Sequence, residues 1–282
     1  MKTNKILIIG KSGNLGGYFL NAYSDEHPKA LGREELDITK EEDVLARISE
    51  IKPDIVINCV AYNAVDKAEK DTQAMAVNGY GPGYIADACK QTGATLVHFS
   101  TGMVFDGNNP EGYKEDDLTA PVNAYGRSKL MGEMEIQTKT ENFYIIRTCW
   151  LFGKKGSGAS NKPSFTDIML DMARQGKTIE AVDDEFGKPT YMKDLAEATK
   201  ALVEEKRPYG IYHLVNSGVC SRFDWANEIF SIAGIDADLS SVSGSKFTRE
   251  AKRPKYEVLN NTKFIELRPW TEALREYLKE NQ

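Results

Sequence analysis

Tyr125 and Lys129 stand four residues apart in a helical pattern, so both side chains emerge on one face of that helix. A free phenol has a pKa of about 10, and a nearby ammonium group favours the phenolate, which brings the phenol toward the range useful for proton transfer. Ser100 and Thr101 stand at the C-terminal end of the predicted strand 95–100, at the edge where open α/β sheets bind ligands. A hydroxyl there can donate to a carbonyl oxygen. These residues together indicate acid–base chemistry on a carbonyl group.

A glycine-rich turn near the N-terminus is typical of a site for a pyrophosphate. Gly10, Gly13 and Gly16 lie between an apolar run and a helical pattern, where the backbone can approach the ligand and the helix N-terminus supplies N–H groups. The spacing GxxGxxG differs from GxGxxG, and glycines that only permit a tight turn are the alternative. A Walker motif is excluded, because it would need glycine where Lys5 stands.

Arg33 lies 17 residues after Gly16, about where the adenosine ribose of a dinucleotide is bound. An arginine there can pair with a 2′-phosphate, which favours NADP(H) over NAD(H) as the cofactor. Glu34 and Glu35 beside it weaken this preference, because a carboxylate repels the phosphate.

The order of elements that must position these residues predicts a parallel sheet covered by helices. Short apolar runs alternate with helical patterns, as in a Rossmann-type doubly wound α/β fold. Thr39 and Glu42 form a capping box that we expect to start one helix. The predicted strands span residues 5–9, 54–60, 95–100 and 143–148, and the predicted helices span residues 14–23, 39–51, 74–91 and 123–138.

The second half predicts a smaller, partly interleaved C-terminal α/β substrate domain. Residues 153–163 are rich in glycine and serine, and we expect a lid over the site there. The dinucleotide-binding domain is predicted to span 1–152 with a later return near 188–215, and the substrate domain mainly 153–282. Within the second half, predicted helices span residues 164–174, 194–205, 222–233 and 271–279, and predicted strands span residues 178–182 and 211–215.

Composition excludes several classes of partner. Thirty-six Lys and Arg against 42 Asp and Glu give a net charge of −6, with no basic block longer than Lys154-Lys155, so a nucleic acid polymer is not expected. No apolar run is long enough for a membrane span or a signal peptide. The four cysteines show no CxxC pair and the three histidines are far apart, so we predict no metal site and a cytoplasmic protein.

A set of motifs, found in order along nearly the whole chain, resembles the extended short-chain dehydrogenase/reductases and, within them, the dTDP-4-dehydrorhamnose reductase family. The motifs are Gly10-Lys-Ser-Gly-Asn-Leu-Gly16, Leu36-Asp-Ile-Thr39, Val56-Ile-Asn-Cys-Val-Ala-Tyr62, Val65-Asp-Lys-Ala-Glu69, Ser100-Thr101, Tyr125-Gly-Arg-Ser-Lys129, Arg147-Thr-Cys-Trp150, Gly187-Lys-Pro-Thr190 and Arg253-Pro254.

The resemblance implies an NAD(P)H-dependent reductase of a nucleotide-linked 4-keto-6-deoxy sugar, with a homodimer as a further expectation. Thr101, Tyr125 and Lys129 would be the catalytic residues, with Lys129 also holding the nicotinamide ribose. The implied cofactor residues, besides Arg33, Tyr125 and Lys129, are Gly10, Ser12, Gly13, Asn14, Leu15, Gly16, Asp37, Ile38, Val60, Ala61, Tyr62, Asn78 and Ser100; the implied substrate residues are Gly102, Met103, Val104, Trp150 and Arg253.

The departures from the family pattern fall on the substrate side. Gly102 and Met103 stand where the family usually has Asp and Tyr, and Glu257 stands where Arg-Pro-x-x-Ser-x-Leu has serine. The substrate is therefore expected to differ from the rhamnose precursor. Two alternatives are an NADP-binding regulatory subunit resembling the β subunit of methionine adenosyltransferase, and a sugar-nucleotide epimerase or dehydratase of the same fold. A dehydratase is less expected, because it would need an acid/base pair beside Thr101, where Gly102 and Met103 stand.

Overall fold

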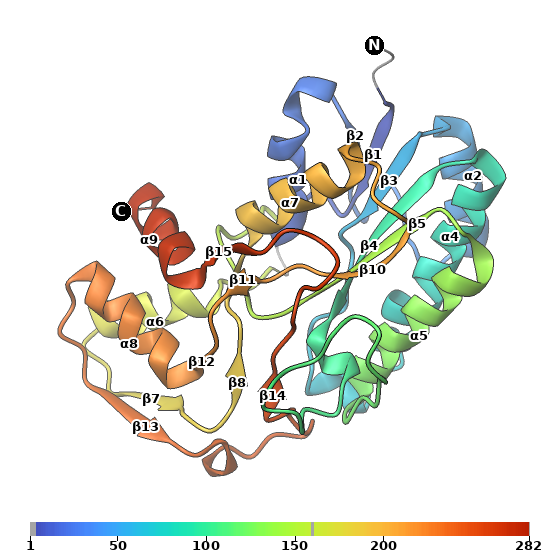
Figure 1. Ribbon diagram of the computed structural model, residues 1–282. Coiled ribbons are helices and arrows are strands. Elements are labelled where there is room, and N and C mark those ends of the chain that lie inside the picture. Colours follow the sequence, from blue (N-terminus) through green and yellow to red (C-terminus); the bar gives the residue numbers. More distant parts are fainter. Residues whose placement is uncertain (1–3, 159–160, 282) are drawn as a thin grey trace.

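The large part of the molecule is built on a six-stranded parallel sheet (Figure 1). The computed structural model describes residues 4–158 and 161–281. The strands lie in the order β10-β5-β4-β3-β1-β2. From β1 the chain adds β2 on one side and β3, β4 and β5 on the other, so the order of strands reverses between β1 and β3. Ligands of such sheets bind at this reversal, beyond the carboxyl ends of the strands. The strands are β1 Ile6–Ile9, β2 Lys29–Leu31, β3 Ile55–Asn58, β4 Thr95–Thr101, β5 Phe143–Thr148 and β10 Gly210–His213.

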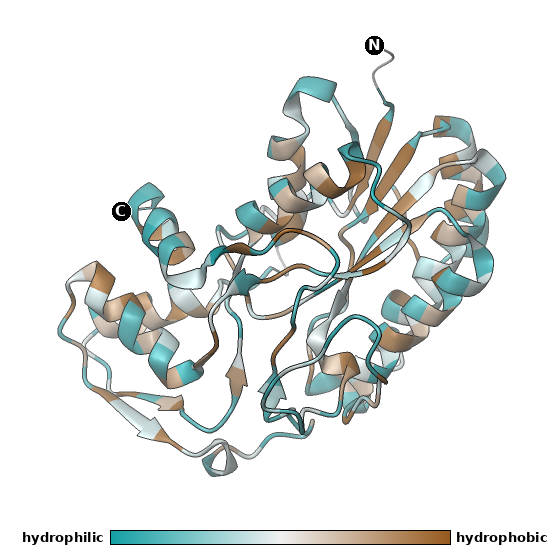
Figure 2. Cartoon of the chain, viewed as in Figure 1, coloured by the Kyte–Doolittle hydropathy of each residue, from teal (hydrophilic) through white to brown (hydrophobic). Residues whose placement is uncertain are grey.

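Helices cover both faces of this sheet. α1 (Asn14–Ala22) and α7 (Met192–Glu204) pack together on one face, and α2 (Glu41–Ile51), α4 (Gly81–Thr92) and α5 (Ala124–Lys139) cover the other (Figure 1). Successive residues of β1 enter the two opposite cores, so the strand is apolar throughout, as its colour in Figure 2 shows. The predicted doubly wound fold is confirmed.

The structure differs from the sequence-based expectation in three places. The predicted helix 74–91 is divided into α3 (Gln73–Met75), a π-helical turn η3 (Ala76–Tyr80) and α4. The predicted capping box is wrong: Lys40 occupies the N-cap position of α2 without a side-chain hydrogen bond, and the Thr39 hydroxyl donates to Asp37 Oδ1 at 2.7 Å. Strand β2 was not identified, because it has only three residues at the sheet edge.

The smaller part has its own core between three helices and short strands (Figure 1). Capping boxes at Ser164 and Ser221 start two of its helices. The helices are α6 Phe165–Arg174, α8 Arg222–Ala233 and α9 Trp270–Glu280, and the strands are β6 Leu151–Phe152, β7 Ile179–Val182, β8 Phe186–Gly187, β9 Thr190–Tyr191, β11 Asn216–Ser217, β12 Cys220–Ser221, β13 Leu239–Val242, β14 Tyr256–Glu257 and β15 Leu267–Pro269.

Four short 3-10 turns complete the described structure, and one of them, η4, follows β4 directly. They are η1 Ser24–Glu26, η2 Lys67–Glu69, η4 Gly102–Val104 and η5 Gly244–Lys246. The chain enters the smaller part after β5, returns to the large sheet as α7 and β10, and leaves it again. None of the helices in the described residues has the length and apolar character needed to cross a membrane.

Candidate active site

The glycine turn, residues 10–16, brings the N-terminus of α1 close to the end of β1. Gly10 has φ +93°, and a Cβ at Gly16 would lie only 2.2 Å from the Gly10 carbonyl oxygen. The N-cap, Gly13, has no capping side chain, so the first-turn N–H groups remain available to a ligand. Two glycines are thus required by the turn itself, while the helix N-terminus and the glycine backbone suit the pyrophosphate of a dinucleotide.

The segment predicted to be a lid lies against this turn. The backbone N–H of Gly156 donates to Asn14 Oδ1 at 2.9 Å, and that of Gly158 donates to the Ser12 carbonyl oxygen at 2.9 Å. Ala159 and Ser160 belong to the same segment but lie outside the described residues. The segment therefore borders the expected pyrophosphate position, and its action as a lid stays a prediction.

The end of β2 carries the groups expected near the adenosine ribose. Arg33 is exposed two residues after β2, at the edge of a hollow of about 600 Å³ that Asp37 also lines. The Glu35 carboxylate accepts a hydrogen bond from the backbone N–H of Gly32 at 2.8 Å and pairs with Lys11 Nζ at 2.5 Å. The sequence did not predict this ion pair, which brings the Lys11 ammonium group close to the residues that follow β2.

Asn78 connects the expected cofactor strand to helix α5. Its side chain is buried in the π-helical turn, where Oδ1 accepts from the Tyr62 N–H at 2.8 Å and Nδ2 donates to Ser128 Oγ at 3.0 Å. A Cβ at Gly132 would lie 2.1 Å from the Asn78 carbonyl oxygen, so the turn and α5 are in close contact. Asn78 thereby orients the Val60–Tyr62 segment; its own contact with a cofactor stays a prediction.

Three contacts at the start of α5 place Tyr125. Asn123 caps the helix by accepting from the Gly126 N–H at 2.7 Å, and Glu69 Oε1 accepts from the Ala124 N–H at 2.7 Å. A Cβ at Gly126 would lie 2.2 Å from the carbonyl oxygen of Met103, so the first turn of α5 packs on η4. These contacts place the Tyr125 phenol near the Thr101 side chain, and its hydroxyl donates to Asn63 Oδ1 at 3.5 Å. Glu69 is the last residue of the motif Val65-Asp-Lys-Ala-Glu69, but nothing in the sequence indicated that it positions α5.

Lys129 does not act on Tyr125 in the way its spacing predicted. Its side chain is buried and Nζ donates to the Phe99 carbonyl oxygen at 2.5 Å. Burial lowers the pKa of Lys129 to about 8, against the opposing effect of Glu133. The pKa of Tyr125 is raised, because the phenol is desolvated and faces the Glu257 carboxylate. The expected lowering of this pKa by Lys129 is therefore wrong for this structure.

Thr101 and Trp150 meet at a carboxylate that sequence reasoning gave no role. Thr101 Oγ1 donates to Glu257 Oε1 at 3.2 Å, and Trp150 Nε1 donates to Glu257 Oε2 at 3.1 Å. Trp150 has a positive φ of 47°, a strained conformation of the kind that concentrates at functional sites. The one signal for Glu257 in the sequence was its departure from the serine of the family motif.

A cavity of about 240 Å³ adjoins these residues and is rich in arginine. Arg222 lies with Cζ 3.7 Å from the Trp150 ring centroid, and Arg253 pairs with Asp66 at 2.7 Å. The predicted substrate residues Met103, Trp150 and Arg253 all line it. The full lining is Met103, Trp150, Phe165, Glu180, Ala181, Val182, Glu185, Arg222, Arg249, Arg253, Pro254 and Glu257.

Two predicted substrate residues do not line this cavity. Val104 is fully buried in a cluster with Phe105 and Tyr113, because η4 turns its side chain into the core. Gly102 is buried behind Glu257. Ser100, predicted on the cofactor side, is also buried and its hydroxyl donates to Glu133. In the described residues, no group of three or more His, Cys, Asp or Glu side chains could hold a metal ion.

The fold and this arrangement of Thr101, Tyr125 and Lys129 define an NAD(P)-dependent oxidoreductase of the short-chain dehydrogenase/reductase class. Residues 4–282 match the family described as RmlD substrate binding domain. The chain belongs to this family, that of the dTDP-4-dehydrorhamnose reductases.

Relatives of known name cover nearly the whole chain. The spore coat polysaccharide biosynthesis protein SpsK of Bacillus subtilis is 37% identical over 98% of this chain and 97% of its own. A dTDP-4-dehydrorhamnose reductase of Streptomyces griseus is 38% identical over 96% and 91%. The crystal structure of dTDP-4-dehydrorhamnose reductase from Bacillus anthracis in complex with NADP is 35% identical with a TM-score of 0.93, over 99% of each chain. The regulatory-subunit and epimerase alternatives are not favoured by these findings.

Proposed function

We propose that this chain reduces the keto group at C4 of a dTDP-linked 6-deoxyhexose, with NADPH preferred to NADH. The observation that carries the proposal is that Tyr125 and Lys129 of α5 lie against the carboxyl end of β4, near Thr101 and the Phe99 carbonyl oxygen, beside an arginine-lined cavity. The reductases similar to it act, by their names, on dTDP-linked keto sugars. The preference for NADPH rests on Arg33 at the end of β2 and on the NADP in the Bacillus anthracis relative.

The residues of this chain can perform the proton-transfer half of the reduction. A reduced nicotinamide, when bound, supplies the hydride that forms the new C–H bond at the ketone carbon. Tyr125 gives its phenolic proton to the ketone oxygen as the C=O π bond becomes a C–O single bond. Its raised pKa keeps the proton on the phenol until the oxygen becomes basic. Lys129 would hold the nicotinamide ribose, and Thr101 would donate a hydrogen bond to the same oxygen.

The cavity suits the anionic end of the substrate. Arg222 is held by the ring of Trp150, which leaves its guanidinium in a fixed orientation at the cavity wall. Arg249 and Arg253 also line the cavity, each paired with a carboxylate, Glu185 and Asp66. A planar guanidinium binds phosphate oxygens in a bidentate manner, so we assign the diphosphate of the sugar nucleotide to this arginine group.

The test is turnover with a panel of substrates. The protein is incubated with NADPH and dTDP-, GDP- or CDP-linked 4-keto-6-deoxy sugars, and the absorbance of the reduced nicotinamide is followed. Oxidation of NADPH with a dTDP-linked sugar is expected. Tight binding of NADPH without oxidation on any member of the panel would instead favour a non-catalytic binding protein.

Four further proposals concern organisation. We propose a dinucleotide-binding domain of residues 1–152 with a return near 188–215, a substrate domain of mainly 153–282, a cytoplasmic location and a homodimer with no nucleic acid polymer as partner. Exposed Tyr80 and Met134, on the packed elements η3 and α5, support the dimer, and light scattering tests it. All four cysteines lie in described residues without a disulfide, which suits a reducing compartment.

A further inference from the structure

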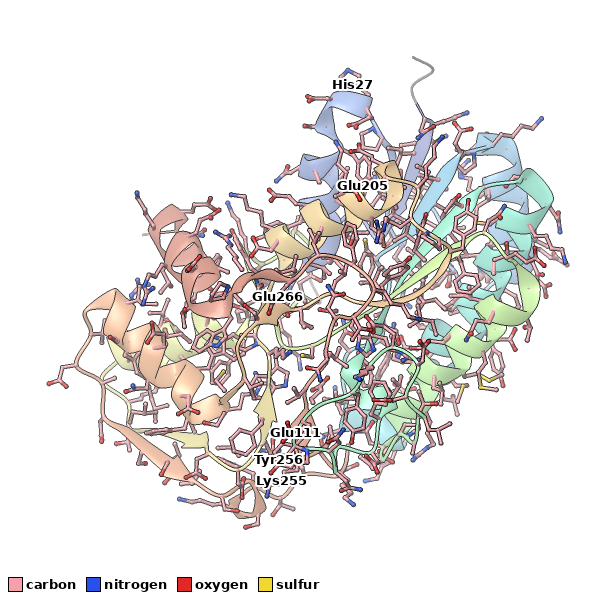
Figure 3. All side chains as sticks on the ribbon, viewed as in Figure 1. His27, Glu111, Glu205, Lys255, Tyr256 and Glu266 are labelled. Carbon is pink, nitrogen blue, oxygen red and sulfur yellow. The ribbon has the colours of Figure 1, made fainter. Side chains whose placement is uncertain are left out.

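Glu257 touches two of the predicted functional groups at once. It is 3% exposed at the end of β14, with one carboxylate oxygen at the Thr101 hydroxyl and the other at the Trp150 indole N–H. Figure 3 labels Lys255 and Tyr256, which precede it, in the lower part of the molecule. The Tyr256 N–H donates to the Gly107 carbonyl oxygen at 3.0 Å, which fixes β14 against the segment after η4. A carboxylate is thereby held rigidly next to a hydroxyl that would bind the reacting ketone.

The space that Glu257 occupies exists because residue 102 is glycine. A Cβ on Gly102 would lie 2.7 Å from Glu257 Cγ and 3.2 Å from its Oε1. Both positions depart from the family motifs, which have a carboxylate at the first and a small residue at the second. In this chain a carboxylate from β14 reaches Thr101, whereas the family motif has its carboxylate in the turn after β4, so the changes at residues 102 and 257 complement each other.

The protonation state of Glu257 decides what the Thr101 hydroxyl can do. Thr101 Oγ1 carries one proton and already accepts from the Met103 N–H at 3.2 Å. An ionised carboxylate can only accept, so it holds the Thr101 proton. A neutral carboxyl can donate its own proton to Oγ1, which leaves the Thr101 proton for a substrate oxygen.

The charged and titratable groups around Glu257 leave both forms accessible. Arg222 from α8 and Arg253 from the segment before β14 favour the ionised form, while burial opposes it and raises the pKa to about 7. Thr101 and Trp150 donate to the carboxylate. Tyr125 on α5 and Cys149 after β5 also face it, and both are kept protonated by burial.

We infer that Glu257 is a positioning residue that switches Thr101: when ionised it holds the Thr101 hydroxyl, and when neutral it releases that hydroxyl to the ketone oxygen. The inference rests on the proposed reductase function. A site of this kind works in its low-pH form. Because the active form carries the proton on Glu257, kcat/KM should fall as the pH rises through the pKa of this residue, by about tenfold per pH unit.

The first test compares pH profiles of kcat/KM from about pH 6 to about pH 9. The parent should show the descending limb near neutrality, and Glu257→Gln should lose it, because an amide donates to Thr101 at every pH. Tyr256→Phe on the same strand is the matched control and should keep the limb. A Glu257→Gln profile that falls as the parent's does would overturn the inference. So would inactivity of this variant at every pH, since that outcome would mean that the charged carboxylate is needed.

The second test needs neither substrate nor cofactor. The Trp150 indole N–H resonance, assigned with Trp150→Phe, should move with pH in ¹⁵N-labelled parent protein, with a midpoint near neutrality, and should stay constant in Glu257→Gln. If Glu257→Gln does not fold, Glu257→Asp keeps the titrating group and should still show a midpoint. An indole resonance that does not titrate in the parent overturns the inference. Absence of turnover on the whole panel, with the titration present, contradicts the proposed function alone.

Discussion

The glycine turn is shaped by its backbone, whereas the arginine-lined cavity is shaped by side chains from segments far apart in the chain. At the turn, Gly10 and Gly16 allow a close approach that a single Cβ would prevent. At the cavity, Trp150, Arg222 and Glu257 come from three separate segments and hold one another by stacking and hydrogen bonds. A backbone site tolerates few substitutions, while at a side-chain site a change in one residue can be matched by a change in its neighbour, as at residues 102 and 257.

The largest expected effect lies between the two regions, at Tyr125. Tyr125→Phe removes the proton donor but keeps the ring, so we expect kcat to fall by about 10²- to 10⁴-fold while NADPH binding changes little. Steady-state kinetics and fluorescence titration measure the two quantities. Turnover within about threefold of the parent would contradict the role of Tyr125. Tyr256→Phe is the control for loss of a phenol outside the site.

A substitution in the glycine turn should lower both the stability of the protein and its affinity for the cofactor. In Gly16→Ala the new Cβ would lie 2.2 Å from the Gly10 carbonyl oxygen, so the turn must shift. We expect a loss of about 1–3 kcal/mol of unfolding free energy and at least about tenfold weaker NADPH binding. Gly17→Ala is the matched control, since nothing lies within 4 Å of a Cβ there. Denaturant unfolding that finds the two variants alike would refute this account of the glycine turn.

The arginine-lined cavity can be tested by returning residues 102 and 257 to the types that the family motifs have there. Gly102→Asp should lower kcat/KM and stability, because its Cβ meets Glu257 at 2.7 Å. Adding Glu257→Ser should recover much of the loss, with a coupling of about 0.5–3 kcal/mol in a double-mutant cycle. For the same reason we expect Gly102→Asp with Met103→Tyr to leave the site distorted as long as Glu257 is present. Additive effects of the two changes would show that residues 102 and 257 do not share one space.

The smallest expected effect is that of Arg33→Ala on the preference for NADPH over NADH. Arg33→Ala should weaken NADPH binding roughly five- to tenfold and leave NADH binding nearly unchanged, because an exposed charge-assisted contact contributes about 1 kcal/mol. Competitive fluorescence titrations give both dissociation constants, with the exposed Arg174→Ala on α6 as the control. An equal loss for both cofactors would remove the basis for preferring NADPH, and would direct attention to Lys11 and Glu35 beside Gly32.

Much of the large sheet could be predicted, because its strands are apolar on both faces and its helices repeat a regular pattern. β2 could not, since three residues at a sheet edge carry little pattern. The capping box at Thr39 failed for a local reason: Asp37, two residues earlier, competes for the same hydroxyl. At the site, Met103, Trp150 and Arg253 were predicted and line one cavity, while Arg222 and Glu257 had no recognised role.

The sequence by itself determined the class of fold, the glycine turn and the Tyr125–Lys129 pair, because each depends on residues close together in the chain. Only the tertiary structure decided that Lys129 donates to Phe99 and that Glu257 reaches Thr101, 156 residues away. The physical reason is that a pKa and a hydrogen-bond partner are set by the groups within a few ångströms in space. Spacing along the chain does not reveal that a strand near the C-terminus packs beside Thr101.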